Sequence, residues 1–278
     1  MTRAGDGPVV LVPGAVKGIG RALALAFLER GYRVILNYWD WEECLQPLQD
    51  MLAPYAGLYA LFRTDLRDTA ALRRFVADAA RRFGGIDVLI NNIERGGWPV
   101  VHGPYVEEQW DLEMATTLRA KWWLFDSCLP YLKRSSGGCV VVLSSIAGIV
   151  GRSGPAAAVF NDGYAAANRG VSSFTETWAR IGAPEVRVNE LMLGFVETRH
   201  AEGTRGWGLL SAAERQAILD HTLLRRTGTL ADVVDAVLFL VERASFMTGS
   251  VLRLDGGYVL GADRVAPMPK GVLEASSG

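Results

Sequence analysis

The chain has 278 residues, half of them hydrophobic, and a formal net charge of -1 at pH 7. This size can bury a large core and fits one α/β domain, so we expect residues 1–278 to form a single domain. The near-neutral balance, without a run of Lys or Arg, argues against nucleic acid or an anionic membrane surface as the main partner.

The start of the chain and its cysteines indicate where the protein works. Residues 1–7 are short and polar, unlike a signal peptide, and the longest apolar stretches are too short to span a bilayer. The three cysteines Cys44, Cys128 and Cys139 lack the spacing of a metal site or a disulfide framework. We therefore expect a cytoplasmic protein without a metal ion.

Short β-branched runs alternate with helix-length segments along the chain. Strands are predicted at 9–12, 33–38, 58–63, 88–91, 140–144, 186–191 and 251–254. Between them, apolar residues recur at helical spacing, as at Ile19, Leu23 and Phe27. This alternation indicates a doubly wound, Rossmann-like α/β fold with about seven parallel strands and helices on both faces. Residues 258–278 form a C-terminal extension, either a partner-contacting arm or a frayed tail.

A glycine motif, Gly14-Ala-Val-Lys17-Gly18-Ile19-Gly20, follows the first predicted strand. Glycines suit this place because the turn is tight, the backbone must approach a pyrophosphate, and the next helix presents its positive N-terminus to that anion. A simple strand-to-helix turn would also account for the pattern. The position after an N-terminal strand favours a dinucleotide site.

Further motifs follow in chain order, and together they resemble the short-chain dehydrogenase/reductase family, in particular its 3-oxoacyl-ACP-reductase-like members. They are the glycine motif, Asp65-Leu66, Asn91-Asn92, Ser144-Ser145, Tyr164, Arg187-Val188-Asn189, residues 194–198, Thr248-Gly249 and Asp255-Gly256-Gly257. The resemblance covers nearly the whole chain. It implies hydride transfer between a nicotinamide cofactor and a ketone or alcohol, with Tyr164 as acid/base and Ser145 polarising the carbonyl.

The same resemblance implies a set of cofactor-binding residues at the ends of the predicted strands. They are Gly14, Lys17, Gly18, Ile19, Gly20, Asp65, Leu66, Asn91, Asn168, Gly194, Val196 and Thr198. A lysine in the glycine loop and the lack of an acid at Tyr38 favour NADP. Asp40 keeps NAD open, because a residue shifted by one or two positions can still bind a ribose.

The chain departs from the family pattern at two of the positions where the family has catalytic residues. Asn168 stands where the family has the lysine that acidifies the tyrosine, and Thr117 stands where it has a catalytic asparagine. A free tyrosine has a pKa of about 10, and an amide can bond ribose hydroxyls but brings no charge. The interval before Tyr164 is also longer than usual, which predicts an expanded loop over residues 151–163.

Lys121 is a candidate substitute for the missing lysine. It lies four residues after Thr117, on the same face of a predicted helix. The favoured alternative is a surface or interface lysine whose stem lies over Trp122 and Trp123. Core packing is expected for Trp110, Trp122, Trp123 and Trp178.

Loops near the predicted site hold further candidates. Glu94 replaces a family glycine, and we favour a solvated residue paired with Arg95 over one that meets phosphates or substrate. Trp98 and His102 follow in the same loop and are candidates to line the substrate site. Residues 199–226 correspond to a substrate-binding lid, whose glycines allow hinge motion.

Two functions remain open from the sequence. The first is an NADP-dependent oxidoreductase that acts on a small carbonyl or alcohol, with Tyr164 and Ser145 as the retained pair. The second is a degenerate family member that binds a nucleotide or another ligand as a sensor or partner module. The family commonly assembles through the helices expected at 111–133 and 164–181, so we expect a homodimer or homotetramer.

Overall fold

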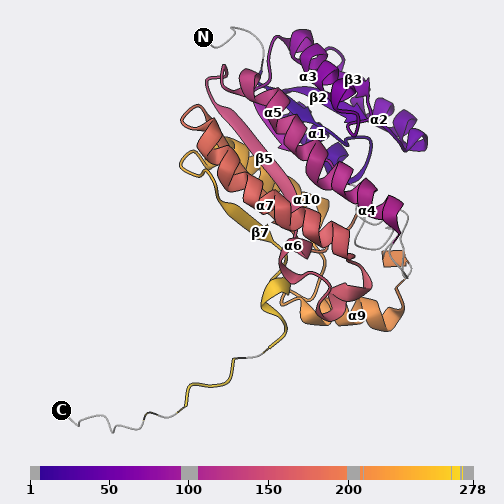
Figure 1. The fold of residues 1–278 in the computed structure, drawn as a ribbon, viewed down its shortest axis with the longest axis vertical. Coiled ribbons are helices and arrows are strands. Elements are labelled where there is room, and N and C mark those ends of the chain that lie inside the picture. Colours follow the sequence, from indigo (N-terminus) through magenta and orange to yellow (C-terminus); the bar gives the residue numbers. More distant parts are fainter. Residues whose placement is uncertain are drawn as a thin grey trace, which may run out of the picture.

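The computed structural model describes residues 7–94, 106–198, 207–208, 210–263, 265–269 and 271. Its centre is a seven-stranded sheet in the order β3-β2-β1-β4-β5-β6-β7, with every neighbouring pair parallel. The strands are β1 (Val9–Val12), β2 (Arg33–Tyr38), β3 (Tyr59–Arg63), β4 (Val88–Asn91), β5 (Gly138–Ser145), β6 (Val186–Leu193) and β7 (Val251–Leu254). The predicted doubly wound fold is confirmed (Figure 1).

Helices cover both faces of this sheet. The described helices are α1 (Gly18–Glu29), α2 (Leu45–Leu52), α3 (Thr69–Phe83), α4 (Glu107–Glu113), α5 (Lys121–Leu132), α6 (Ala147–Val150), α7 (Asp162–Gly182), α9 (Ala212–His221) and α10 (Leu230–Leu238). A π-helical segment, η3 (Met114–Ala120), joins α4 to α5. None of the helices within the described residues is both long and apolar enough to cross a membrane.

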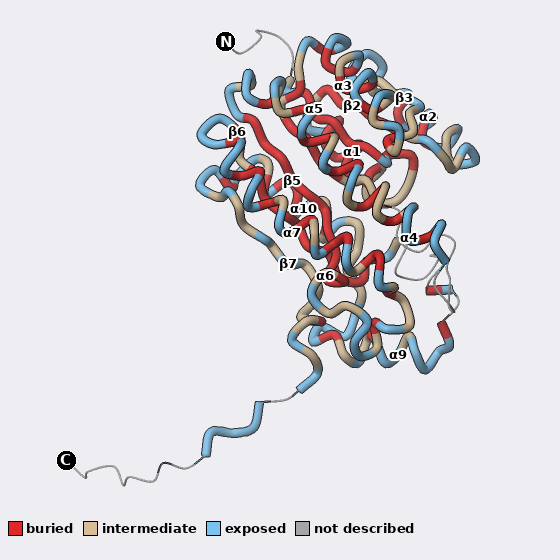
Figure 2. Tube along the Cα trace, in the orientation of Figure 1, coloured by how far each residue is buried: buried red, intermediate tan, exposed pale blue. Residues whose placement is uncertain are grey.

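The alternation of side chains along each strand divides the core between the two faces. Val10 and Val12 of β1 pack with residues of α1, α2 and α10. Val9 and Leu11 of the same strand pack with residues of α3, α5 and α7. The inner strands of the sheet are therefore buried on both sides, as the red trace at β5 and β6 shows (Figure 2), whereas the edge strands β3 and β7 are partly exposed.

The strand order places one topological switch point at β1. This strand pairs with β2 on one side and with β4 on the other, so the chain leaves β1 and β4 in opposite directions. In open α/β sheets, ligands bind in the crevice outside the carboxyl ends of strands at such a point. The fold thus directs attention to the loops after β1 and β4.

The C-terminal extension begins inside the fold. Tyr258, at the start of η6 (Tyr258–Leu260), is buried, and its ring packs against Phe195 and His221. Beyond it, Val265 and Met268 are exposed, and the described part of the extension runs away from the body (Figure 1). The first residues of the extension therefore contribute to the core.

Two tryptophans differ from their predicted place in the core. Trp110 and Trp122 are 40% and 37% exposed, whereas Trp178 is buried at 2%. Trp178 stacks on Phe125 with ring centroids 4.5 Å apart. The core prediction is therefore wrong for Trp110 and Trp122, which lie on the outer sides of α4 and α5.

Candidate active site

The glycine motif forms a tight turn between β1 and α1. Gly14 and Gly18 have φ angles of 63° and 57°, in the left-handed region that favours glycine. A Cβ on Gly20 would lie 2.3 Å from the carbonyl oxygen of Gly14, so only glycine fits there. The turn leaves the N-terminus of α1 facing the crevice, which suits a pyrophosphate.

Loops that follow three strands meet at this turn. Asn92, just after β4, donates from Nδ2 to the carbonyl of Pro13 at 3.1 Å. A Cβ on Gly18 would lie 4.0 Å from Cγ2 of Thr198, which follows β6. The predicted cofactor residues Gly14, Gly18, Gly20 and Thr198 therefore share one edge of the sheet.

Close packing also explains the glycine at position 194. A Cβ there would lie 2.7 Å from the Cα of Asp255, so a side chain would displace the loop after β7. Two residues on, Val196 pairs with Gly228 in an isolated β-bridge and accepts a hydrogen bond from the backbone N–H of Thr198 at 2.6 Å. The loop after β6 is thus fixed from both sides.

The adenine end of the predicted site has its own contacts within the chain. Nζ of Lys17 lies 2.9 Å from the ring centroid of Trp41, a cation–π contact. Asp65 accepts from Nε and Nη2 of Arg67 at 2.9 and 2.7 Å, and this hydrogen bonding raises the pKa of the guanidinium. Leu66 beside it is buried. The basic and acidic groups expected at the adenosine already have partners in the protein.

Tyr164 and Asn168 lie one turn apart on α7 and face the end of β5. Asn168 is fully buried, and its Oδ1 accepts from the backbone N–H of Ser145 at 2.9 Å. Its Nδ2 donates to the carbonyl of Tyr164 at 3.0 Å. The amide thus joins the two predicted catalytic residues through their backbones, and its contact with a ribose stays a prediction.

Glu94 meets the tyrosine directly. The hydroxyl of Tyr164 donates a hydrogen bond to Oε1 of Glu94, across 70 residues of sequence. Glu94 is thus partly buried and its carboxylate binds the tyrosine, while the expected pairing with Arg95 stays a prediction. Arg95, Trp98 and His102 lie outside the described residues.

Lys121 is an interior residue. It is completely buried, and its Nζ donates to the carbonyl of Leu143 at 2.5 Å. The carbonyl of Lys121 itself accepts from Nδ2 of Asn91 at 2.9 Å. The favoured prediction of a surface or interface lysine is wrong, since the side chain turns inward to β5, two residues before Ser145.

Two buried polar atoms near these residues have no hydrogen-bond partner among the described residues. They are the hydroxyl oxygen of Thr117 and Oδ1 of Asn91. Thr117 lies in the π-helical segment η3, a feature that often marks functional sites. Unsatisfied buried groups of this kind are places where a ligand or an ordered water completes the bonding.

The N-terminus of α7 is held by residues that the motifs did not indicate. Oδ1 of the N-cap residue Asn161 accepts from the backbone N–H of Tyr164 at 2.8 Å. Nδ2 of Asn161 donates to Oε1 of the buried Glu113, on α4, at 2.6 Å. An asparagine three residues before Tyr164 is a sequence signal for such a cap. No sequence signal indicates that Glu113 would contact it.

A second buried carboxylate lies deeper, below the end of β5. Glu190 of β6 accepts from the hydroxyls of Ser144, of Ser172 at 2.9 Å and of Thr175 at 3.2 Å. Buried carboxylates are tolerated when such donors surround them. This cluster connects β5, β6 and α7, and no motif had pointed to Glu190.

Segments around the predicted substrate side are partly described. Residues 199–206 and 209 of the lid lie outside the described part, whereas Trp207 and Leu210 are buried near Phe195. The expanded loop 151–163 contains the helical turn η4 (Gly154–Ala158), where the backbone N–H of Ala156 donates to Oη of Tyr258 at 2.7 Å. The C-terminal segment thus supports this loop.

The sheet order, the glycine turn and the buried tyrosine beside a strand-end serine define an α/β protein of the dinucleotide-binding class. Residues 14–259 match the family model described as Enoyl-(Acyl carrier protein) reductase. The chain therefore belongs to the short-chain dehydrogenase/reductase family of oxidoreductases, as its motifs had indicated.

Relatives of known name extend along nearly the whole chain. Ketoacyl reductase 2 of the granaticin polyketide synthase, so assigned in Streptomyces violaceoruber, is 35% identical over 92% of this chain and 98% of its own. The 3-oxoacyl-[acyl-carrier-protein] reductase FabG of Thermotoga maritima is 31% identical over 92% and 99%. The 1,6-dihydroxycyclohexa-2,4-diene-1-carboxylate dehydrogenase of Pseudomonas putida is 32% identical over 92% and 94%.

A solved structure is also similar. A protein of Sinorhizobium meliloti 1021, assigned as a short-chain alcohol dehydrogenase, superimposes with a TM-score of 0.78 at 26% identity. The match covers 92% of this chain and 98% of that one. The two proteins thus share this architecture over most of both chains.

Proposed function

We propose that this protein is an NADP-dependent oxidoreductase that interconverts a ketone and an alcohol. The observation that supports this best is the buried pair of Tyr164 and Ser145, joined through the amide of Asn168 beside the crevice. Tyr164 exchanges a proton with the substrate oxygen, and Ser145 donates its hydroxyl hydrogen to that oxygen. The named relatives include reductases of ketones and a dehydrogenase, which supports the same reaction type.

The residues around the glycine turn fit a dinucleotide. Gly14 and Gly18 provide a backbone that approaches the pyrophosphate closely, and α1 presents its N-terminus. Ile19, Gly20, Asn91, Gly194, Val196 and Thr198 complete the proposed lining, with Asp65 and Leu66 at the adenine. When bound, the cofactor supplies or accepts a hydride. We favour NADP because Lys17 lies in the loop and Tyr38 ends β2; NAD is the alternative.

A second candidate function follows from the residues around the tyrosine. Asn168 brings no charge where the family has a lysine, and Thr117 brings no amide where it has an asparagine. Glu94 brings a negative charge to the tyrosine hydroxyl. These features favour a member that binds a nucleotide or another ligand without turnover. The two candidates share a nucleotide site and differ in whether Tyr164 transfers a proton.

One experiment separates these candidates. Nicotinamide fluorescence is followed while NADPH and NADH are titrated into the protein, and a panel of ketones and secondary alcohols is then assayed with wild type and Tyr164→Phe. Turnover that depends on Tyr164 supports the oxidoreductase. Binding without such turnover supports the sensor, and binding of neither nucleotide contradicts both nucleotide-based functions.

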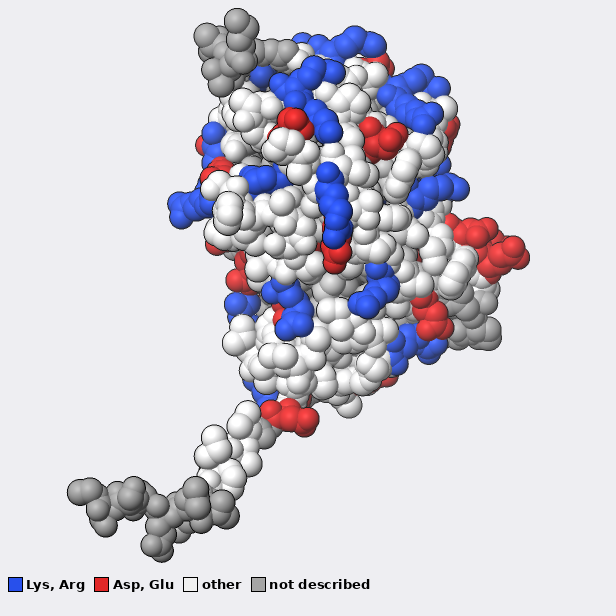
Figure 3. All heavy atoms as spheres, turned by 60° about the vertical axis from the view of Figure 1, so that its left-hand side comes forward, with Lys and Arg blue, Asp and Glu red and all other residues white. Residues whose placement is uncertain are grey.

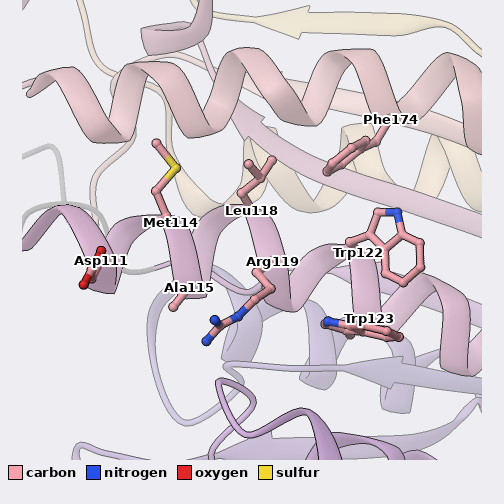
Figure 4. A pocket seen from close by; sticks show the side chains of 8 residues that line it. All are labelled: Asp111, Met114, Ala115, Leu118, Arg119, Trp122, Trp123 and Phe174. Atoms are coloured by element: carbon pink, nitrogen blue, oxygen red, sulfur yellow. The ribbon is translucent and has the colours of Figure 1, made fainter.

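We also propose a cytoplasmic homo-oligomer that assembles through α5 and α7. Two neighbouring cavities of about 760 and 340 Å³ lie along these helices, and both are lined by Trp122 and Phe174. Figure 4 shows Leu118 and Phe174 between the helices, with Trp122 and Trp123 beside them. The exposed Trp122 and the partly buried Trp123 and Phe174 around this groove suit a second copy of the chain. On the face in Figure 3, charges of both signs are interspersed.

A further inference from the structure

We propose that Glu94 is the proton-accepting partner of Tyr164, and that the site is built for the oxidation of a secondary alcohol. This inference rests on the proposed function and assigns a direction and a residue to it. The carboxylate would take the place of the missing lysine as the group that controls the tyrosine proton.

The geometry places the two groups in direct contact. Glu94 comes from the loop after β4, two residues beyond Asn92, and Tyr164 comes from the first turn of α7. The tyrosine is buried at 2% exposure, and its hydroxyl hydrogen is directed at Oε1 of Glu94. A carboxylate acceptor stabilises the protonated phenol, whereas a lysine ammonium stabilises the phenolate.

The proton path follows from this contact. During oxidation the O–H bond of the alcohol breaks and its proton moves to Oη of Tyr164, while the phenol O–H bond breaks and that proton moves to Oε1 of Glu94. The carbinol C–H bond breaks as the new C=O bond forms, and the hydride goes to the oxidised nicotinamide of the proposed function. Glu94 is only partly buried, so its proton can pass on to water.

Such a path explains two departures together. The tyrosine remains neutral from start to finish, so no phenolate forms and no cation is required beside it. The amide of Asn168 can then serve to hold Ser145 and Tyr164 by their backbones. The family pattern combines a lysine at position 168 with a glycine at position 94. This chain combines Asn168 with Glu94, and each pair would control the tyrosine proton in its own way.

Other charged groups also lie on α7 or on the elements packed against it. Lys121 of α5 donates a hydrogen bond to the carbonyl of Leu143, and Glu113 of α4 accepts one from Asn161. Glu190 of β6 accepts from the hydroxyl of Ser172. On α7 itself, Asp162 pairs with Arg152 at 3.4 Å, and Arg169 is adjacent to Asn168. These groups are common to wild type and to a variant at position 94, so a comparison of the two isolates the Glu94 charge.

The first test is the pH profile of both reaction directions with NADP⁺ or NADPH, using wild type, Glu94→Gln and Glu94→Asp. For Glu94→Gln we expect a loss of about 10² to 10³ in the oxidation rate at neutral pH. That rate should recover toward alkaline pH, where the phenol ionises, and Glu94→Asp should retain most activity. Wild-type reduction should rise as the pH falls and Glu94 becomes protonated. A Glu94→Gln profile equal to that of wild type would overturn the proposal.

The second test needs no cofactor. Tyrosinate absorbance is titrated in wild type and in Glu94→Gln, each against the same protein that also carries Tyr164→Phe, so that the difference reports Tyr164 alone. The Tyr164 signal should appear at a lower pH once the carboxylate is gone. Glu108→Gln, which removes an exposed charge on α4, serves as the matched control and should match wild type.

The outcomes of the two tests distinguish a failure of the proposed Glu94 role from a failure of the proposed oxidoreductase function. Equal Tyr164 titrations in wild type and Glu94→Gln would overturn the role of Glu94, whatever the catalytic result. Failure to bind either nucleotide would overturn the proposed function, while the titration would still decide whether Glu94 controls the tyrosine proton.

Discussion

The amide oxygen of Asn168 accepts a hydrogen bond from the backbone N–H of Ser145, with 2.9 Å between the two atoms. The contact joins α7 to the last residue of β5, and the same side chain bonds the carbonyl of Tyr164. The separation of the tyrosine and the serine therefore depends on an amide at this position. Replacement of the family lysine has turned a charged side chain into a structural connection.

We expect Asn168→Ala to destabilise the protein by about 1–3 kcal/mol, because a buried backbone N–H loses its acceptor. Denaturant unfolding measures the change. Gln216→Ala on the surface of α9 is the control, and it should change the free energy of unfolding by less than about 0.5 kcal/mol. Equal stability of Asn168→Ala and wild type would contradict the connection.

Tyr164→Phe should lower turnover by about 10² to 10⁴, the usual contribution of a general acid or base. The substitution keeps the ring that packs against Phe160, with centroids 5.8 Å apart, so nucleotide affinity should stay the same. Steady-state kinetics and fluorescence titration check the two parts. Tyr131→Phe, on α5, is the control and should behave as wild type; retained activity in Tyr164→Phe would exclude the acid/base role.

The fold was readable from the sequence because it depends on local patterns. Each predicted strand corresponds to an observed one, and β6 extends through Leu193, beyond the predicted end at Leu191, because its pairing with β5 and β7 continues there. The glycine turn was also predictable, because the positive φ angles it requires are adopted by glycines, Gly14 and Gly18, that the sequence shows directly.

Side-chain contacts between distant segments were not readable in the same way. The bond from Tyr164 to Glu94 spans 70 residues, and the side chain of Lys121 reaches a carbonyl 22 residues away. Nothing local distinguishes such a lysine from a surface residue, because its burial depends on how α5 packs against the sheet. Trp122 illustrates the reverse case, since a large apolar residue that looks like core lies exposed on α5.

Tyr258→Phe should destabilise the protein by about 1–3 kcal/mol, because the backbone N–H of Ala156 would lose its buried acceptor. Tyr59→Phe in β3 is the control. Burial raises the pKa of Tyr258 from 10.0 to about 12, so its contribution is complete below pH 10 and is lost as the pH rises toward 12. Unfolding measured across this range should show the difference between wild type and Tyr258→Phe narrowing; a constant difference would contradict the assignment.

Asp232 gives the opposite pH dependence. Its hydrogen bond from Arg226, with those from the backbone and hydroxyl of Thr229, lowers its pKa from 3.8 to about 2. The stabilising contribution is present above pH 3.8 and is lost as the pH falls toward 2. Thermal unfolding should show Asp232→Asn less stable than wild type at neutral pH, with the two melting temperatures converging in acid. Added salt should weaken the effect, because the pair is exposed.

Trp122→Asp should shift the protein from an oligomer to a monomer. The substitution places a charge beside the two cavities along α5 and α7, where a second copy would have to bury it. Size-exclusion chromatography with light scattering measures the mass. Trp39→Asp is the control, since Trp39 is similarly exposed, at 41%, but follows β2. A wild-type protein that is already monomeric would contradict this interface.

Glu190 affects how α7 is oriented where it packs on the sheet. Its carboxylate is satisfied by hydroxyls that α7 presents at Ser172 and Thr175, on the helical face shared with Tyr164 and Asn168. Apolar packing alone would tolerate a small rotation or slide of this helix, but a buried charge would then lose its donors. The interior carboxylate thus selects one rotational setting of α7, and the direction in which the tyrosine hydroxyl points is decided two turns away from it.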